Sequence, residues 1–266
     1  MQNFNYHSHT YRCGHADNSM SDEDYVKEFI KQGFKKIVFT DHAPQKERID
    51  TRLYMRMEYS QAKEYIDSIN TLKHKYKDII DIETGFEVEY LPGQEKNLFE
   101  LKRMVDKLIL GQHFIYTDDM SGLKIYRVDK FNHSDLIKYA NYIKATAELN
   151  LVDVIAHPDL FMLSSTTFGD SEKEASEIIC KASKESGIPL EINLGELAFH
   201  TSSTAKTAHY PRKEFWEIAS RYNVNVIYGI DAHGRAQIER YKSSVNLANE
   251  IIGKDALKGL NFLESL

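Results

Sequence analysis

Seven short apolar segments recur along the chain, and each is followed by a segment with the pattern of a helix. Strands of a parallel sheet that is covered by helices on its outer face read as short, continuous apolar runs. The alternation of the two kinds of segment therefore predicts an α/β architecture. The expected strands are residues 3–9, 36–40, 79–88, 108–111, 152–156, 188–193 and 224–229.

The intervening segments carry helix signals. Ser21 followed by Asp24 resembles a capping box, and Gly33 suits the end of that helix. Pro211 suits a first helical turn. The expected helices are residues 21–33, 57–76, 94–106, 133–149, 171–186, 211–222 and 236–252, with an irregular excursion over 116–131. Seven strand-then-helix units favour a closed parallel barrel over an open sheet, and we expect one domain over residues 1–266.

Histidine and carboxylate side chains follow the ends of the apolar runs. Residues i and i+2 of a strand point to the same face, so His7 and His9 present two imidazoles side by side. Alone, such a pair is as typical of a polar cluster as of a metal site, but the pattern repeats. Barrel active sites lie at the carboxyl ends of the strands. The predicted ligands are His7, His9, His15, His42, Glu87, His113, His157, Asp231 and His233.

This ligand chemistry predicts a catalytic metal centre. Imidazole and carboxylate suit Zn²⁺, Fe²⁺ and Mn²⁺, and nine such groups exceed what one ion can bind. We therefore expect two or three divalent ions as cofactors. The two cysteines, Cys13 and Cys180, form no CxxC pattern and imply no disulfide framework. Cys13 lies between predicted ligands and is expected to be a small buried thiol.

The composition excludes some partners. The formal net charge is −6 with a pI near 6.0, and no block of basic residues stands out, which argues against binding to nucleic acid. The N-terminus lacks a signal-peptide pattern, and no apolar run approaches the roughly 18 residues of a membrane span. We expect a cytoplasmic protein with no membrane partner, and a small anionic substrate would need local positive charge, such as metal ions. The oligomeric state stays open.

The order of the ligand motifs resembles that of one family. The sequence resembles the PHP (polymerase and histidinol phosphatase) superfamily, and most closely its histidinol-phosphate phosphatases. The resemblance spans nearly the whole chain and implies a distorted (β/α)7 TIM-like barrel with a trinuclear centre at the carboxyl ends of the strands. The motifs that carry it are His7-Ser8-His9, His15, Thr40-Asp41-His42, Gly85-Phe86-Glu87, Gln112-His113-Phe114, His157-Pro158 and Gly229-Ile230-Asp231-Ala232-His233.

Carried over by motif, the resemblance implies an assignment of ligands to ions. The first ion would bind His7, His9, Glu87 and Asp231; the second would bind Glu87, His113 and His157; the third would bind His15, His42 and His233. The implied reaction is hydrolysis of L-histidinol phosphate in histidine biosynthesis, by attack of a metal-bound hydroxide on phosphorus. Two alternatives remain: a phosphoesterase for a nucleotide or another small phosphomonoester, and a non-catalytic metal-binding regulatory module.

One departure from the family pattern concerns substrate binding. Glu191-Ile192-Asn193 is intact, but residues 194–198 lack the basic residue that often follows this motif in the family. Arg12 and Arg235 are candidates for that positive charge, against the alternative of solvated arginines. No general acid is singled out. Further candidates for substrate contact are His200, His209, Tyr116, Asp118 and Asp119; Asp41 is a candidate to orient a ligand, and His74 and His133 are expected on the surface.

Overall fold

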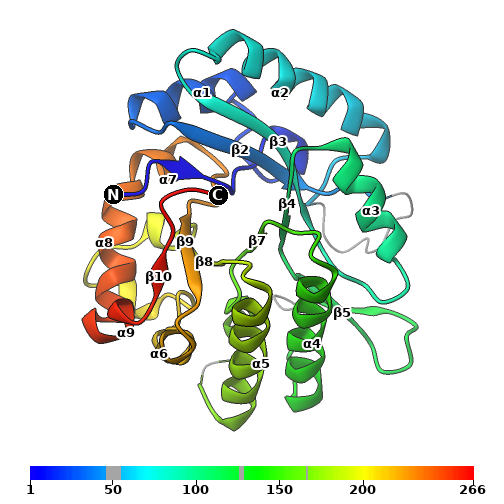
Figure 1. Ribbon diagram of the computed structural model, residues 1–266, viewed down its shortest axis with the longest axis vertical. Helices are drawn as coiled ribbons and strands as arrows, with labels where there is room; N and C mark the ends of the chain where they lie inside the picture. Colours follow the sequence, from blue (N-terminus) through cyan, green and yellow to red (C-terminus); the bar gives the residue numbers. More distant parts are fainter. Residues whose placement is uncertain (46–54, 126–128, 166) are drawn as a thin grey trace.

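The protein is a ring of parallel strands surrounded by helices (Figure 1). The computed structural model describes residues 1–45, 55–125, 129–165 and 167–266. Within them, eight parallel strands follow the order β1-β2-β3-β4-β7-β8-β9-β10. Their bounds are β1 (Phe4–Asn5), β2 (Lys36–His42), β3 (Asp81–Val88), β4 (Lys107–Leu110), β7 (Val154–Ile155), β8 (Leu190–Asn193), β9 (Asn225–Gly229) and β10 (Asn261–Phe262).

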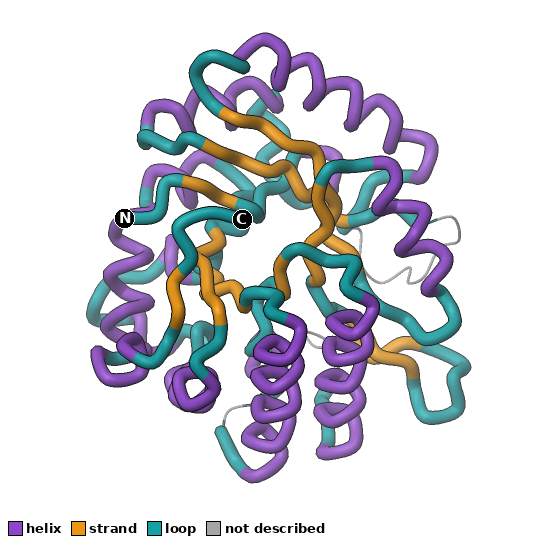
Figure 2. Tube along the Cα trace, viewed as in Figure 1, coloured by secondary structure: helices purple, strands orange, loops and turns teal. Residues whose placement is uncertain are grey.

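The ring closes between the segments that follow β1 and β9. Ser8 and Ala232 form a parallel bridge, and the backbone N–H of His9 donates to the carbonyl of Ala232 at 2.9 Å. Figure 2 shows the ring of strands with helices on its outside. The predicted (β/α)7 barrel is confirmed, and β10, which the sequence analysis did not predict, adds a strand beside β9.

The helices cover the outer face of the ring. The predicted cap of the first helix is confirmed: the Ser21 hydroxyl accepts from the backbone N–H of Asp24, and the Asp24 carboxylate accepts from the backbone N–H of Ser21. None of the described helices is long and apolar enough to cross a membrane. The bounds are α1 (Asp22–Lys31), α2 (Ala62–Tyr76), α3 (Glu95–Met104), α4 (His133–Leu149), α5 (Asp170–Ser186), α6 (Lys213–Tyr222), α7 (Arg235–Glu239), α8 (Tyr241–Ile252) and α9 (Lys254–Lys258).

Two apolar cores follow from the alternation of side chains along each strand. The larger core packs the outer face of the sheet against the helices. The smaller core fills the barrel, so the interior is packed and is no pore. The C-terminal segment closes one end of this interior, because Leu263 and Leu266 pack on the smaller core and the Tyr6 hydroxyl donates to the carbonyl of Leu266 at 2.8 Å. The smaller core contains Phe4, Tyr6, Val38, Ile109, Val154, Ala156 and Ile227.

Several predicted boundaries differ from the structure. The helix expected over 57–76 starts as a 3₁₀ turn, η2 (Tyr59–Gln61), before α2, and the helix expected over 236–252 divides at Arg240, where the backbone leaves helical dihedrals. The excursion over 116–131 contains part of a hairpin of β5 (Phe114–Tyr116) and β6 (Leu123–Ile125), while residues 126–128 lie outside the described part of the chain. Single 3₁₀ turns also occur at η1 (Tyr11–Cys13), η3 (Leu160–Ser164), η4 (Leu197–Phe199) and η5 (Ala205–Thr207).

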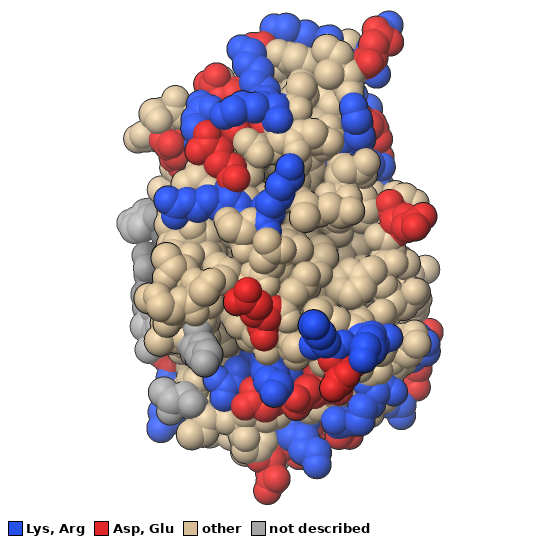
Figure 3. Space-filling model, turned by 90° about the vertical axis from the view of Figure 1, so that its left-hand side faces the viewer, with Lys and Arg blue, Asp and Glu red and all other residues tan. Residues whose placement is uncertain are grey.

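Charges of both signs share the visible surface. On the face shown in Figure 3, Lys and Arg side chains lie among Asp and Glu side chains, with uncharged surface between them. This face therefore lacks the continuous basic band that a phosphate backbone would require.

Candidate metal centre

All nine predicted ligands gather at the carboxyl ends of the strands. His42 is the last residue of β2, and Glu87 lies near the end of β3; their positions are paired directly in the sheet register. The other seven lie in the segments that follow η1, β1, β4, β7 and β9. Because the strands are parallel, these ends meet at one edge of the barrel, as the sequence pattern predicts. The seven are His7, His9, His15, His113, His157, Asp231 and His233.

Glu87 lies at the centre of the cluster. Its Oε1 lies 2.8 Å from Nε2 of His157 and 3.3 Å from Nε2 of His113. Its Oε2 lies 2.9 Å from Nδ1 of His42, and 3.5 Å from Nε2 of both His7 and His9. One buried carboxylate therefore faces five imidazoles, an arrangement suited to bridging metal ions.

Room for the Glu87 side chain depends on Gly111, which directly follows β4. A Cβ atom at residue 111 would lie 1.8 Å from Oε1 of Glu87, far inside van der Waals contact. The residue directly after β4, the strand next to Glu87, must therefore lack a side chain.

Asp231 is a second carboxylate in the centre. Its Oδ1 lies 3.1 Å from Nε2 of His9, 3.3 Å from Nε2 of His7 and 3.4 Å from Nδ1 of His233. The backbone of Asp231 has a φ of +52°, and that of His157 a φ of +28°. Such left-handed conformations of non-glycine residues concentrate at functional sites, where the surrounding structure holds them.

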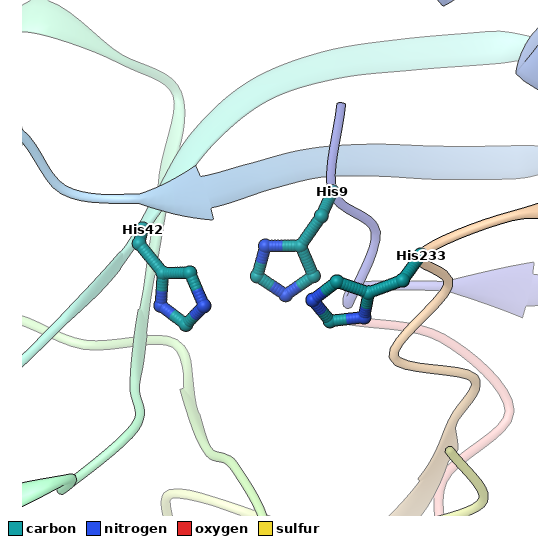
Figure 4. Close-up of side chains that lie close together, drawn as sticks. All are labelled: His9, His42 and His233. Carbon is teal, nitrogen blue, oxygen red and sulfur yellow. The ribbon is translucent and has the colours of Figure 1, made fainter. Parts of the chain in front are cut away.

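Three imidazoles from separate segments of the chain lie close together (Figure 4). The donor atoms of His9, His42 and His233 lie within 4.8 Å of one another, and the rings of His9 and His233 stack with centroids 4.1 Å apart. His15 lies beside this group, with its ring centroid 4.5 Å from that of His233. His9 also groups with His7 and Glu87, so it stands between two candidate ion positions.

The donor atoms fit divalent metal ions. Within the described residues, six buried polar atoms of the cluster lack a hydrogen bond of favourable geometry, even where a neighbouring atom is close, as between His42 and Glu87; such atoms normally have partners. All six are nitrogen or carboxylate oxygen atoms of the kind that Zn²⁺, Mn²⁺ or Fe²⁺ accepts. They are Nδ1 of His9, His42 and His157, Nε2 of His233, Oε2 of Glu87 and Oδ1 of Asp231.

The buried carboxylates of the cluster also favour positive charge at this site. Burial lowers the pKa of His113, but Glu87 and Glu89 outweigh burial and raise that pKa to about 9. Burial also lowers the pKa of His7, but the carboxylates of Asp231, Glu191 and Glu87 outweigh burial and raise that pKa well above its usual value. Burial lowers the pKa of His15 and of His233 to about 4, so both imidazoles are neutral at pH 7, the form that binds metals.

Cys13 and Asp41 lie next to the cluster. Burial, with a smaller contribution from Asp41, raises the pKa of the Cys13 thiol to about 12, which keeps the sulfur protonated and supports its interpretation as a buried thiol. Asp41 accepts hydrogen bonds from the backbone and the hydroxyl of Thr10, and its Oδ1 lies 3.8 Å from Nδ1 of His9. Its short contacts are therefore with Thr10 rather than with a ligand.

A cavity of about 700 Å³ opens above the cluster. Leu160, Leu163, Phe199 and Tyr210 supply an apolar wall, and seven of the nine metal-binding candidates, all except His7 and His9, form the floor. The predicted substrate contacts His200 and His209 both line this cavity. So does Glu196, whose carboxylate lies 3.1 Å from Nδ1 of His209 and 3.8 Å from Nε2 of His200.

The two arginines proposed as phosphate ligands do not line the cavity. Arg235 donates to Glu28 at 2.8 Å. Arg12 is buried and makes paired contacts of 2.8–3.0 Å with Asp22 and Glu64. Both guanidinium groups are engaged by carboxylates, so we do not retain either as a phosphate ligand. Tyr116, Asp118 and Asp119 also lie outside the cavity lining, while His74 and His133 are exposed, as expected.

Replacing Arg12 with Ala should lower stability and leave substrate binding unchanged. The change leaves the buried Asp22 without its cation, and breaking such a pair costs about 3 kcal/mol of unfolding free energy. Urea denaturation and phosphate-release kinetics measure the two effects. The matched control is Arg221→Ala, which removes an exposed arginine paired with Glu177 and should cost at most about 0.5 kcal/mol. A large rise in KM with unchanged stability would return Arg12 to the substrate site.

Two buried carboxylates that the sequence analysis gave no role contact the predicted ligands. Glu191 bonds to His7, and Glu89 bonds to His113. A signal for Glu89 exists in the sequence, because Glu87 and Glu89 are two residues apart on a strand pattern and so share a face. Glu191 belongs to the intact Glu-Ile-Asn motif, whose position at a strand end carries the same signal.

Comparison with known proteins agrees with this geometry. A protein named "Probable histidinol-phosphatase" from Deinococcus radiodurans is 24% identical over 257 residues, covering 93% of each chain. The histidinol-phosphatase of Bacillus subtilis is 31% identical over 155 residues, covering 56% of this chain and 57% of that protein. The crystal structure of histidinol phosphate phosphatase from Lactococcus lactis, complexed with zinc, L-histidinol and phosphate, matches with a TM-score of 0.71 at 20% identity, covering 98% of this chain and 95% of that one.

The family model described as the PHP domain matches residues 5–195. This range includes seven of the nine candidate ligands, from His7 to His157, and ends shortly before Asp231 and His233. The ring of parallel strands and the clustered histidines agree with the match. The chain belongs to the PHP domain family.

Proposed function

We propose that this protein is a metal-dependent phosphomonoesterase that hydrolyses L-histidinol phosphate to L-histidinol and phosphate. The observation that carries the proposal is the set of nine imidazole and carboxylate ligands around Glu87 and Asp231, seven of which line a cavity. The similarity to histidinol-phosphatases over most of the chain supports the choice of substrate.

Three divalent ions would share the nine ligands. We assign His7, His9, Glu87 and Asp231 to the first ion, Glu87 with His113 and His157 to the second, and His15, His42 and His233 to the third. Bound there, the ions would neutralise the phosphate and lower the pKa of water so that it becomes a nucleophile near pH 7. The shared carboxylate of Glu87 would hold the ions close together.

The cavity above the ions supports a small substrate with a cationic part. Its apolar wall includes Phe199 and Tyr210, and beyond the cluster it carries the carboxylate of Glu196. L-Histidinol phosphate has an ammonium group and an imidazole that a carboxylate can bind. We propose that His200 and Glu196 contact this part of the substrate, while the phosphate lies against the metal ions.

Phosphate release from L-histidinol phosphate and from a panel of nucleotides, with metal content measured on the same sample, tests the proposal. We expect kcat/KM for L-histidinol phosphate of roughly 10⁴ M⁻¹s⁻¹ or more, with two or three metal ions per chain. A higher value for a nucleotide would move the protein to another phosphomonoester and keep the chemistry. Bound metal without hydrolysis of any phosphomonoester would favour a regulatory module instead.

A further inference from the structure

Glu191 lies behind the first histidine of the cluster. This side chain of β8 is fully buried, and its Oε1 lies 2.8 Å from Nδ1 of His7. Its Oε2 accepts from the backbone N–H of His157 at 2.9 Å and from the Asn193 side chain at 2.9 Å. The carboxylate therefore contacts a candidate ligand of one ion with one oxygen and the backbone of a candidate ligand of another ion with its other oxygen.

Glu89 occupies the equivalent place behind His113. Its Oε1 lies 2.9 Å from Nδ1 of His113. Both of its oxygens also accept from Arg56, at 2.8 Å and 3.1 Å, and Arg56 donates in turn to the carbonyl of Ala43. Glu89 is thus held in place by a cation that contacts both of its oxygens, including the one that faces the histidine.

We propose that Glu191 and Glu89 are positioning residues that fix His7 and His113 with Nδ1 protonated and Nε2 aimed at the metal ions. The proposal rests on the metal centre of the proposed function. A carboxylate accepts but does not donate, so each contact requires a hydrogen on Nδ1 and leaves Nε2 as the nitrogen that can bind an ion once it has lost its own proton. Nε2 of His7 lies 3.3 Å from Oδ1 of Asp231, and Nε2 of His113 lies 3.3 Å from Oε1 of Glu87, so both Nε2 atoms face the centre. Such partners of ligand histidines set ring orientation and basicity.

A glycine makes room for the Glu191 side chain, as another does for Glu87. A Cβ atom at Gly229, the last residue of β9, would lie 1.6 Å from Oε1 of Glu191. The two glycines at strand ends, Gly111 and Gly229, each face one buried carboxylate. The competing interpretation is that Glu191 only joins neighbouring strands through its hydrogen bond with the His157 backbone. Under that interpretation, either tautomer of His7 is allowed.

Glu191→Gln and Glu89→Gln separate the two interpretations. An amide offers one acceptor and one donor group. If its NH₂ group faces the histidine, it favours the tautomer with hydrogen on Nε2, which cannot bind a metal. We expect each variant to bind one ion about 10 to 100 times more weakly than the wild type in titrations of the metal-free protein with Zn²⁺. Nitrogen-15 NMR of the Zn²⁺-loaded wild type should show His7 and His113 protonated on Nδ1.

The matched control is Glu172→Gln. Glu172 is also a buried carboxylate with hydrogen bonds, but its partners are Ser165 and Gly169 at the start of α5. Its replacement should leave Zn²⁺ affinity unchanged. Unchanged Zn²⁺ affinity in both the Glu191 and Glu89 variants overturns the inference, while wild-type protein that binds no metal overturns the proposed function instead. If both variants fail to fold, hydrogen on Nε2 of His7 and His113 in the wild-type spectra decides against the inference.

Discussion

Replacing Glu87 with Gln is expected to lower kcat/KM for phosphate release by about 1,000-fold or more. The exchange keeps the size of the side chain but removes the charge that faces five imidazoles, including those of His42 and His157 at 2.9 Å and 2.8 Å. An amide is a poor bridging ligand. Loss of Lewis-acid stabilisation worth several kcal/mol at the transition state corresponds to a rate loss of about this size.

Metal content measured on the same sample shows how the Glu87 variant fails. We expect fewer ions per chain together with an unchanged circular dichroism spectrum, because the barrel is held by its two apolar cores rather than by Glu87. The control is Glu83→Gln on the same strand, which removes a carboxylate that pairs with Lys36 at 3.1 Å and contacts no candidate ligand. Activity close to wild type in the Glu87 variant would refute the central role of this carboxylate.

The candidate centre is predictable because its positions obey a rule of topology. Parallel strands end at one edge of a barrel, so residues such as Glu87 and Asp231, far apart in sequence, meet once the strands are recognised. The strands were recognisable because each is a short apolar run between helices. The local capping motif of Ser21 and Asp24 also predicted a helix start, since capping depends on residues within one turn.

Long-range pairing is where the sequence fails as a guide. Arg12 lies between two predicted ligands and so was a candidate for phosphate, yet its partner Glu64 is 52 residues away on α2. No pattern among neighbouring residues predicts a contact over that distance in sequence. The strand β10 has only two residues, Asn261 and Phe262, which is too short for any periodicity to show. Its position depends on pairing with β9, which only the folded chain reveals.

The partners of the ligand histidines illustrate an intermediate case. Glu89 shares a face with Glu87 by simple alternation, but its contact with Arg56 depends on a side chain that precedes β3 by a whole helix. Gly111, which makes room for Glu87, directly follows the strand next to that carboxylate, and Gly229, which makes room for Glu191, ends the strand next to that one. Sequence can suggest such carboxylates; the atoms that they contact follow from the register of the sheet.

Removing the metal ions with a chelator is expected to abolish phosphate release and to lower the melting temperature by about 10 °C. The free protein would retain buried histidines and carboxylates in close contact, six of whose atoms lack a hydrogen bond of favourable geometry in the described residues. An ion present at about 1,000 times its Kd contributes about 4 kcal/mol to the folded state. For a chain of this size, each kcal/mol shifts the melting temperature by about 2–4 °C.

Calorimetry before and after chelation, followed by addition of Zn²⁺, Mn²⁺ or Fe²⁺ one at a time, measures both effects. Activity that returns with one metal identifies an ion that supports turnover, and the melting temperature should recover with it. The Glu87→Gln variant provides an internal control, because a protein that has already lost an ion should show a smaller shift on chelation. Full activity at a metal content far below one ion per chain would instead require chemistry carried by the side chains alone, and the cluster around Glu87 and Asp231 would then need another explanation.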